Sequence, residues 1–173
     1  EIICKDVNKA NEFLKNLEEN IKYYLAVYNQ STLSEIHEIS NDYVKSIIKS
    51  LATLKVFNIK AHTSFVMHLL REFSKGHLSI KNISKFIEAA VKFHFRYNVI
   101  YAYPGNTIRL HYRESLKSML GTQIDKNSIL RDLNFDGIKY NVQNFEEFEE
   151  KFRQKVRYSE RENSNRKLVR YIL

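Results

Sequence analysis

The side chains best suited to metal or acid–base chemistry are six histidines, and their spacing does not form a site. They have no cysteine or carboxylate partners at the spacings typical of zinc ligands. His94 lies in line with Ile87, Ala90 and Tyr97 on an apolar helical face, which favours a hydrogen-bonded core histidine over a ligand. We therefore predict no metal site. The histidines occupy positions 37, 62, 68, 77, 94 and 111.

Other catalytic constellations are not recognisable either. The four glycines are isolated, so no glycine-rich loop is available to bind phosphates. Cys4 lies near the start of the chain beside no recognisable base, and no Gly-x-Ser-x-Gly motif is present. The carboxylates within residues 146–150 fit the solvated first turn of a helix better than an acid–base pair. The sequence predicts no catalytic residue and no cofactor in this segment.

Positive charge is concentrated at the C-terminal end. Residues 151–173 hold eight basic and two acidic side chains, a net charge of +6, whereas the first 150 residues carry +2. Such a segment can contact the phosphates of DNA, and a solvated helix face without a nucleic-acid role is the alternative. The predicted DNA-contacting residues are Arg153, Lys155, Arg157, Arg161, Arg166, Lys167 and Arg170.

Composition favours a helical domain. The 173 residues are 43% hydrophobic and include 11 Tyr and 11 Phe, enough for a packed core, but only 4 Gly and 1 Pro. We expect one all-α domain over residues 1–173, an irregular bundle of about six to eight helices around a long central helix. The single cysteine and the lack of a long apolar run predict a soluble protein of the reducing cytosol, without a membrane partner.

Hydrophobic periodicity places the helices. It predicts helices at 7–28, from Asn41 or Asp42 to about Phe57, and at 63–73 with an end at Gly76. The apolar face of the first helix is formed by Ala10, Phe13, Leu14, Leu17, Ile21, Leu25 and Tyr28. The second and third of these are expected to form an antiparallel pair. A long helix is predicted from Ser79 into the aromatic stretch 93–103, and another after Pro104-Gly105-Asn106, with Ile108, Tyr112, Leu116, Met119 and Leu120 inward. Further helices are predicted at 128–133, from a capping box at Asn144 and Glu147, and from Asn163.

Several stretches resemble a known family. They run from Phe57-Asn58-Ile59-Lys60 to Leu69-Leu70-Arg71-Glu72-Phe73, then Leu78-Ser79-Ile80-Lys81-Asn82-Ile83, then Ile87-Glu88-Ala89-Ala90-Val91-Lys92-Phe93-His94-Phe95-Arg96-Tyr97-Asn98-Val99-Ile100. Together they resemble the middle helical region of GmrSD-type restriction proteins. The ending Arg166-Lys167-Leu168-Val169-Arg170-Tyr171-Ile172-Leu173 resembles the helix that opens the HNH nuclease domain of that family. The similarity spans residues 8–173 and is carried by hydrophobic patterns.

The resemblance implies a three-part parent protein that restricts modified phage DNA: a nucleotide-handling ParB/sulfiredoxin-like domain, a helical middle and an HNH nuclease. This chain contains neither the Asp-Gly-Gln-Gln-Arg signature of the first part nor the His-Ile-x-Pro and Asn motif of the last. It begins without Met and stops inside an apolar stretch, so we expect a piece of a longer protein, with residues 159–173 starting the HNH domain. Its expected role is a connector that orients the two flanking catalytic domains and contacts DNA; the alternative is a protein-interaction or homodimerisation module.

Overall fold

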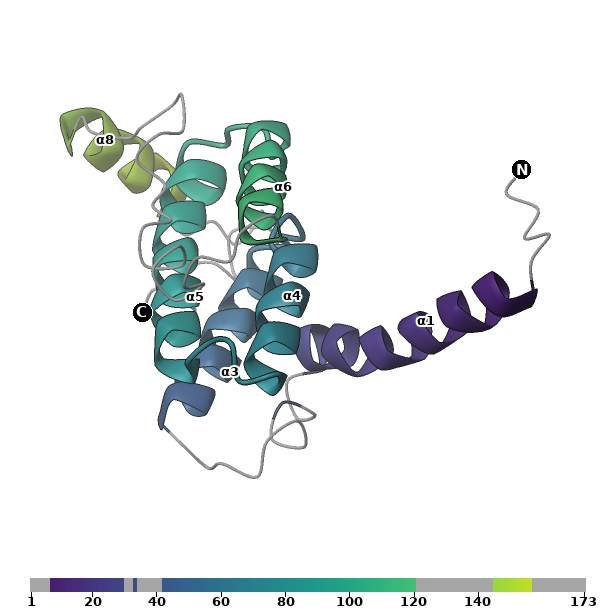
Figure 1. Ribbon diagram of the computed structural model, residues 1–173. Coiled ribbons are helices and arrows are strands. Elements are labelled where there is room, and N and C mark those ends of the chain that lie inside the picture. Colours follow the sequence, from purple (N-terminus) through teal and green to yellow (C-terminus); the bar gives the residue numbers. More distant parts are fainter. Residues whose placement is uncertain (1–6, 30–32, 34–41, 121–144, 157–173) are drawn as a thin grey trace.

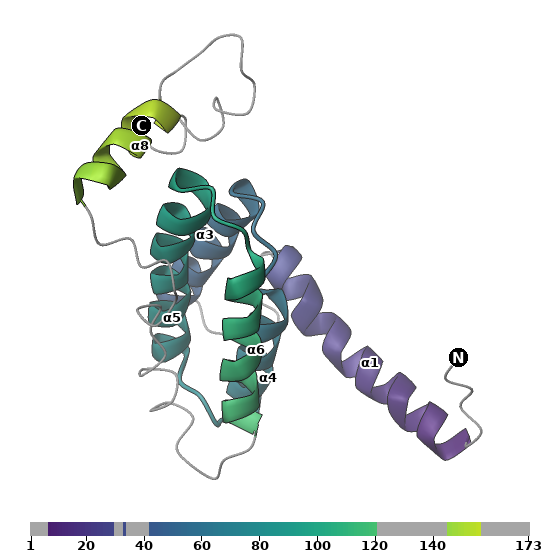
Figure 2. The same ribbon diagram turned by 90° about the horizontal axis from the view of Figure 1, so that it is seen from above.

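The computed structural model describes residues 7–29, 33, 42–120 and 145–156, and in these ranges helices are joined by short turns. They contain six α-helices and one π-helical segment, and no strand. The predicted all-α class is therefore confirmed. Figure 1 and Figure 2 show α3, α4, α5 and α6 side by side in a bundle, with α1 projecting away from it. The elements predicted at 128–133 and from Asn163, and the cap at Asn144, lie outside the described residues.

The centre of the bundle is built on α3 (Asp42–Val56) and α5 (Ile80–His94), which share the most extensive helix–helix contact. The buried positions of both helices recur every three or four residues, as the periodicity predicts. Polar groups also join them, because the Glu88 carboxylate of α5 accepts hydrogen bonds from Ser46 of α3 and from Ser84. The buried apolar residues are Val44, Ile47, Leu51 and Leu54 on α3 and Ile83, Phe86, Ile87 and Ala90 on α5.

The helix α4 (Thr63–Ser74) ends just before Gly76, as the sequence predicts. Gly76 has a φ of +76°, its N–H donates to the carbonyl of Phe73, and the N–H of His77 donates to the carbonyl of Glu72. This pair of bonds is the Schellman motif. The helix α4 packs mainly against α1 and α6, and α3 packs mainly against α5. The predicted pairing of α3 with α4 is therefore not the dominant contact of either helix. The aromatic ring of Phe65 on α4 packs against Phe86 of α5 and Tyr112 of α6.

The long central helix is confirmed. Its cap is Ser79, whose side chain accepts a hydrogen bond from the N–H of Asn82. After α5 the chain continues without a break into the π-helical segment η2 (Phe95–Ile100), where the N–H of Tyr101 donates to the carbonyl of Arg96, five residues earlier. Tyr97, Ile100 and Tyr101 are all buried, so the alternating aromatic pattern belongs to a widened helix and not to a strand.

Two further helices flank this core. The helix α6 (Asn106–Leu120) buries Ile108, Tyr112 and Met119, but Leu120, which we expected to face inward, is exposed, since it projects from a different side of the helix than Met119. The helix α8 (Phe145–Val156) packs against η2 through aromatic pairs. They join Tyr101 to Phe148 and Phe95 to Phe152, and the guanidinium of Arg96 lies 5.8 Å from the centre of the Phe148 ring. Arg96 and the aromatic rings around it therefore together hold α8 against η2.

The first helix, α1 (Val7–Tyr28), contacts the bundle through its C-terminal part. Its buried residues are Tyr23, Ala26 and Val27, and the hydroxyl of Tyr23 lies 2.6 Å from the hydroxyl of Ser74 on α4. The helix bounds agree with the prediction. The apolar face that the periodicity identifies, which includes Phe13, Leu14 and Leu17, nevertheless lies along the part of α1 that projects beyond the bundle, and it is exposed.

Candidate functional site

Three places in the fold could serve as a functional site: a buried polar cluster around His94, two hollows beside the turn between α3 and α4, and the exposed face of α1. They are formed by different elements of the fold.

The polar cluster joins α5 to α6 in the core. Asn98 donates from Nδ2 to the carbonyl of Tyr103 over 3.1 Å, so its Oδ1 is the amide atom that faces His94 at 2.6 Å. An amide oxygen only accepts, so Nδ1 of His94 carries the proton and Nε2 accepts from the Tyr112 hydroxyl, 2.9 Å away. Every polar atom of this imidazole is therefore bonded inside the protein. The prediction of a hydrogen-bonded core histidine is confirmed.

A second buried histidine lies beside it. His62, at the start of α4, has its ring centre 6.5 Å from that of His94, and its Nδ1 has no hydrogen-bond partner in the described part of the chain. Burial lowers the pKa of His62 to about 4, with a smaller contribution from His94. Burial also lowers the pKa of His94 to about 4, against the opposing effect of its bond to Asn98. Burial raises the pKa of the Tyr112 hydroxyl. All three side chains are neutral at pH 7.

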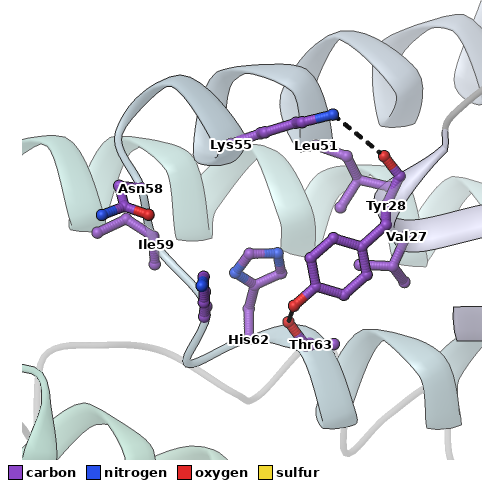
Figure 3. Close-up of a pocket in the computed structure, with 9 residues that line it drawn as sticks. Val27, Tyr28, Leu51, Lys55, Asn58, Ile59, His62 and Thr63 are labelled. Carbon is purple, nitrogen blue, oxygen red and sulfur yellow. Dashed lines mark hydrogen bonds between the residues drawn. The ribbon is translucent and has the colours of Figure 1, made fainter.

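Figure 3 shows a small hollow where α1, α3 and the turn before α4 meet. The Nζ of Lys55 donates to the carbonyl of Tyr28 over 3.4 Å, and the Tyr28 hydroxyl lies 3.5 Å from that of Thr63. The hollow holds about 50 Å³, far less than the several hundred Å³ of a typical ligand pocket. We interpret it as the joint that fixes α1 to the bundle.

A larger, open hollow of about 340 Å³ lies on the other side of the same turn. Its rim carries the cations Lys60 and Arg109, and no carboxylate is among the described residues that line it. His94 and Asn98 reach its wall, but their hydrogen-bonding atoms are already used within the cluster. In the described ranges, no group of three or more His, Cys, Asp or Glu residues is placed to hold a metal ion. The hollow offers positive charge at its edge without an acid–base pair.

The exposed face of α1 is the largest unpartnered apolar feature of the described residues. We call it the α1 stripe and define it as Val7, Ala10, Leu14, Leu17, Ile21, Tyr24 and Tyr28, the last of which is half-buried and also packs against the bundle. Its large members at 7, 14, 17, 21 and 24 are 74%, 58%, 49%, 49% and 46% exposed, and Phe13 and Leu25 beside it are 64% and 45% exposed. Monomeric proteins rarely leave a continuous apolar surface of this kind without a binding role.

The sequence predicts an apolar face on this helix, with Phe13 and Leu25 in place of Val7 and Tyr24, but does not say whether the face belongs to the core or to an interface. The signal that distinguishes the two cases was present, because Tyr23, Ala26 and Val27 form a second apolar face near the C-terminal end of the same helix. A helix with two apolar faces needs two sets of neighbours. Only the second face is covered by α4 and α3.

Of the seven basic residues predicted to contact DNA, the structure describes Arg153 and Lys155, both on α8. Arg153 is exposed and forms an ion pair of 2.6 Å with Glu149, one turn earlier. Lys155 is half-buried. The other five, Arg157, Arg161, Arg166, Lys167 and Arg170, lie outside the described residues, so the DNA contact stays a prediction.

Comparisons with known proteins leave the family of this chain open. No family model, no curated protein and no solved structure matches it. In the described part of the chain, every helix is too short or too polar to cross a membrane. The fold and the site together define a helical bundle with a projecting, apolar-faced arm.

Proposed function

We propose that this chain is a helical connector that holds other protein parts in place and supplies no reactive group of its own. The observation that carries the proposal is the division of α1 into two faces. One face is anchored to the bundle through Tyr23, Ala26 and Val27, and the other, the α1 stripe, is left for a neighbour. A helix fixed at one end and apolar along its free length is suited to association.

The polar interior supports the same role. His94, Asn98 and Tyr112 hydrogen-bond to one another or to backbone, so they stiffen the bundle and leave no atom free for a substrate. The Glu88 carboxylate is likewise occupied by two serine hydroxyls. A connector needs such rigidity, since it must keep the parts that it joins at a fixed separation.

For the parent protein we propose a modification- and nucleotide-dependent DNA restriction endonuclease of the GmrSD type, acting against phage. The support is the sequence resemblance over residues 57–73, 78–83, 87–100 and 166–173. In that setting the bundle would lie between a nucleotide-handling domain and an HNH nuclease. Sequencing the gene on both sides of this segment tests the assignment, and a reading frame without either signature contradicts it.

The connector role itself has a separate test in the longer protein. We expect that replacing residues 42–120 with a flexible linker of equal length abolishes the activity of the whole, although each flanking part keeps its own ligand binding. The matched control is the same protein with Leu110→Asp, an exposed position on α6. Full activity of the linker variant contradicts a positioning role.

Contact between DNA and the basic C-terminal segment is the second part of the proposal. Reversing Arg153, Arg157, Arg161 and Arg170 to Glu should weaken DNA binding similarly for different sequences and reduce its salt dependence. The control reverses four exposed lysines of the bundle, Lys45, Lys49, Lys81 and Lys85, which changes the net charge by the same amount. Equal affinities for the wild type and the C-terminal variant would exclude the contact and favour a protein-interaction module.

A further inference from the structure

The α1 stripe has the spacing of a coiled-coil seam. Its seven positions, from Val7 to Tyr28, alternate strictly between steps of three and four residues. This is a heptad repeat in which Val7, Leu14, Ile21 and Tyr28 occupy position a, and Ala10, Leu17 and Tyr24 occupy position d. A globular core does not require so regular a repeat, whereas a seam with one partner helix does.

The anchoring of α1 prevents the stripe from turning into the bundle. Tyr23, Ala26 and Val27 project from other sides of the helix and are at most 5% exposed. The bond between Tyr23 and Ser74 fixes the rotation of α1 relative to α4. Whatever covers the stripe therefore approaches from outside the bundle, along the free length of α1 seen in Figure 2.

We propose that the α1 stripe binds the α1 stripe of a second copy of this chain as an antiparallel coiled coil. The register follows from pairing each a position with a d position. Leu14 of one copy then faces Leu17 of the other, Ala10 faces Ile21, and Val7 faces Tyr24. The twofold axis repeats each of these pairs, which gives six layers. In two of them, the small side chain of Ala10 makes room for a large one.

The charges beside the stripe favour this direction. Glu18, at position e, borders the stripe, and Lys15, at position b, lies behind it on the same side of α1; both are exposed. In the antiparallel register, Lys15 of each copy lies next to Glu18 of the other. Two ion pairs, each between a lysine and a glutamate, therefore form between the two copies. In a parallel pair, Glu18 would instead lie next to Phe13 and no ion pair would form. The surface of α1 is thus complementary to itself in one direction only.

The expected dimer is weak and depends on concentration. The 22 residues of α1 provide just three heptads, so the seam has few apolar layers. Because the bundle already orders the C-terminal end of α1, part of the entropy cost of forming the seam is met before association. This inference rests on the proposed role of α1 as an association arm and names its partner.

The first experiment is sedimentation equilibrium of the whole chain over a wide range of concentrations. We expect a monomer–dimer equilibrium whose dissociation constant rises at least about 100-fold in the Leu14→Asp, Leu17→Asp double variant, since four leucines leave the seam. Both positions are solvent-exposed in the single chain, so the fold should tolerate the change. Leu110→Asp, at a position 51% exposed on α6, is the matched control and should leave the equilibrium unchanged.

Charge exchange tests the direction of the pair. Lys15→Glu and Glu18→Lys should each weaken the dimer by about fivefold, because each places like charges across the seam. An equimolar mixture of the two variants should associate as well as the wild type, since every cross-seam pair then has opposite signs. Circular dichroism of each variant checks that its helix content is unchanged. Failure of the mixture to recover would exclude the antiparallel register.

The outcomes separate this inference from the proposed function. A wild-type chain that stays monomeric at the highest concentration overturns the pairing of two copies. If the Leu14→Asp, Leu17→Asp variant of the longer protein then also loses activity, the stripe is covered by another part of that protein, and the association arm stands. If that variant keeps full activity, both proposals fail.

Discussion

The Tyr112 hydroxyl donates a hydrogen bond to Nε2 of His94 across 2.9 Å, and this bond joins α6 to the central helix inside the core. Both side chains are buried, at 3% and 0% exposure. The rings also stack, with centres 5.9 Å apart and planes inclined by 24°. One polar contact and one aromatic contact thus fix the same pair of helices.

Removing the Tyr112 hydroxyl should destabilise the bundle. In Tyr112→Phe the ring packing persists, but the acceptor Nε2 of His94 is left buried without a partner, which costs about 1–3 kcal/mol. Urea unfolding followed by circular dichroism measures the change in the free energy of unfolding. Tyr24→Phe, on the exposed side of α1, should stay within about 0.5 kcal/mol of the wild type. Equal losses for the two variants would contradict the role of this bond.

Acid should weaken the fold through its two buried histidines. In the folded chain the pKa values of His62 and His94 lie at about 4, below their unfolded value of 6.5. Between these values the unfolded state binds protons and the folded state does not, so stability is fully present above pH 6.5, falls as the pH drops, and levels off below about 4. The loss is roughly 3 kcal/mol for each histidine at most.

Imidazole proton resonances provide a direct readout of the same effect. We expect two histidines of the chain to titrate near pH 4 by nuclear magnetic resonance, and the urea midpoint to decrease from pH 6.5 to 4. In His62→Gln the decrease over this interval should be about half as large, because one of the two groups no longer titrates. An unchanged slope in that variant would show that His62 does not contribute.

A substitution at Gly76 tests the left-handed end of α4. With a φ of +76°, Gly76→Ala should cost about 1 kcal/mol, although no atom lies within 4 Å of the added Cβ. Gly105→Ala is the matched control, since its added Cβ is equally unobstructed and its φ is not in the left-handed region. We expect a change within about 0.5 kcal/mol there. Thermal or urea unfolding of both variants distinguishes conformational strain from crowding.

The attachment of α8 should depend on Arg96. Arg96→Ala removes the cation that lies over the Phe148 ring and should increase amide hydrogen exchange in α8 by about two- to fivefold. Exchange in α3 and α5 should not change. Lys92→Ala, an exposed position one turn earlier on the same helix, is the control. If exchange in α8 is the same in both variants, Arg96 does not help to hold this helix.

Local sequence signals predicted much of the fold. The bounds of α1, the start of α3 at Asp42, the cap at Ser79 and the end of α4 at Gly76 each depend on neighbouring residues, so they can be deduced from spacing and residue type. The same holds for His94, whose place on an apolar stripe made a core position the simplest interpretation. The prediction for Leu120 was wrong because this residue projects from a different side of α6 than Met119.

The sequence by itself determined that the chain is helical, where most of its helices begin and end, and that α1 has a regular apolar face. Only the tertiary structure decided that this face is left exposed, because the anchor at Tyr23, Ala26 and Val27 depends on contacts with residues about 50 positions away in the chain, such as Ser74. Periodicity within one helix cannot tell a core face from an interface. Whether an apolar face becomes part of the core or an interface depends on where the rest of the chain packs.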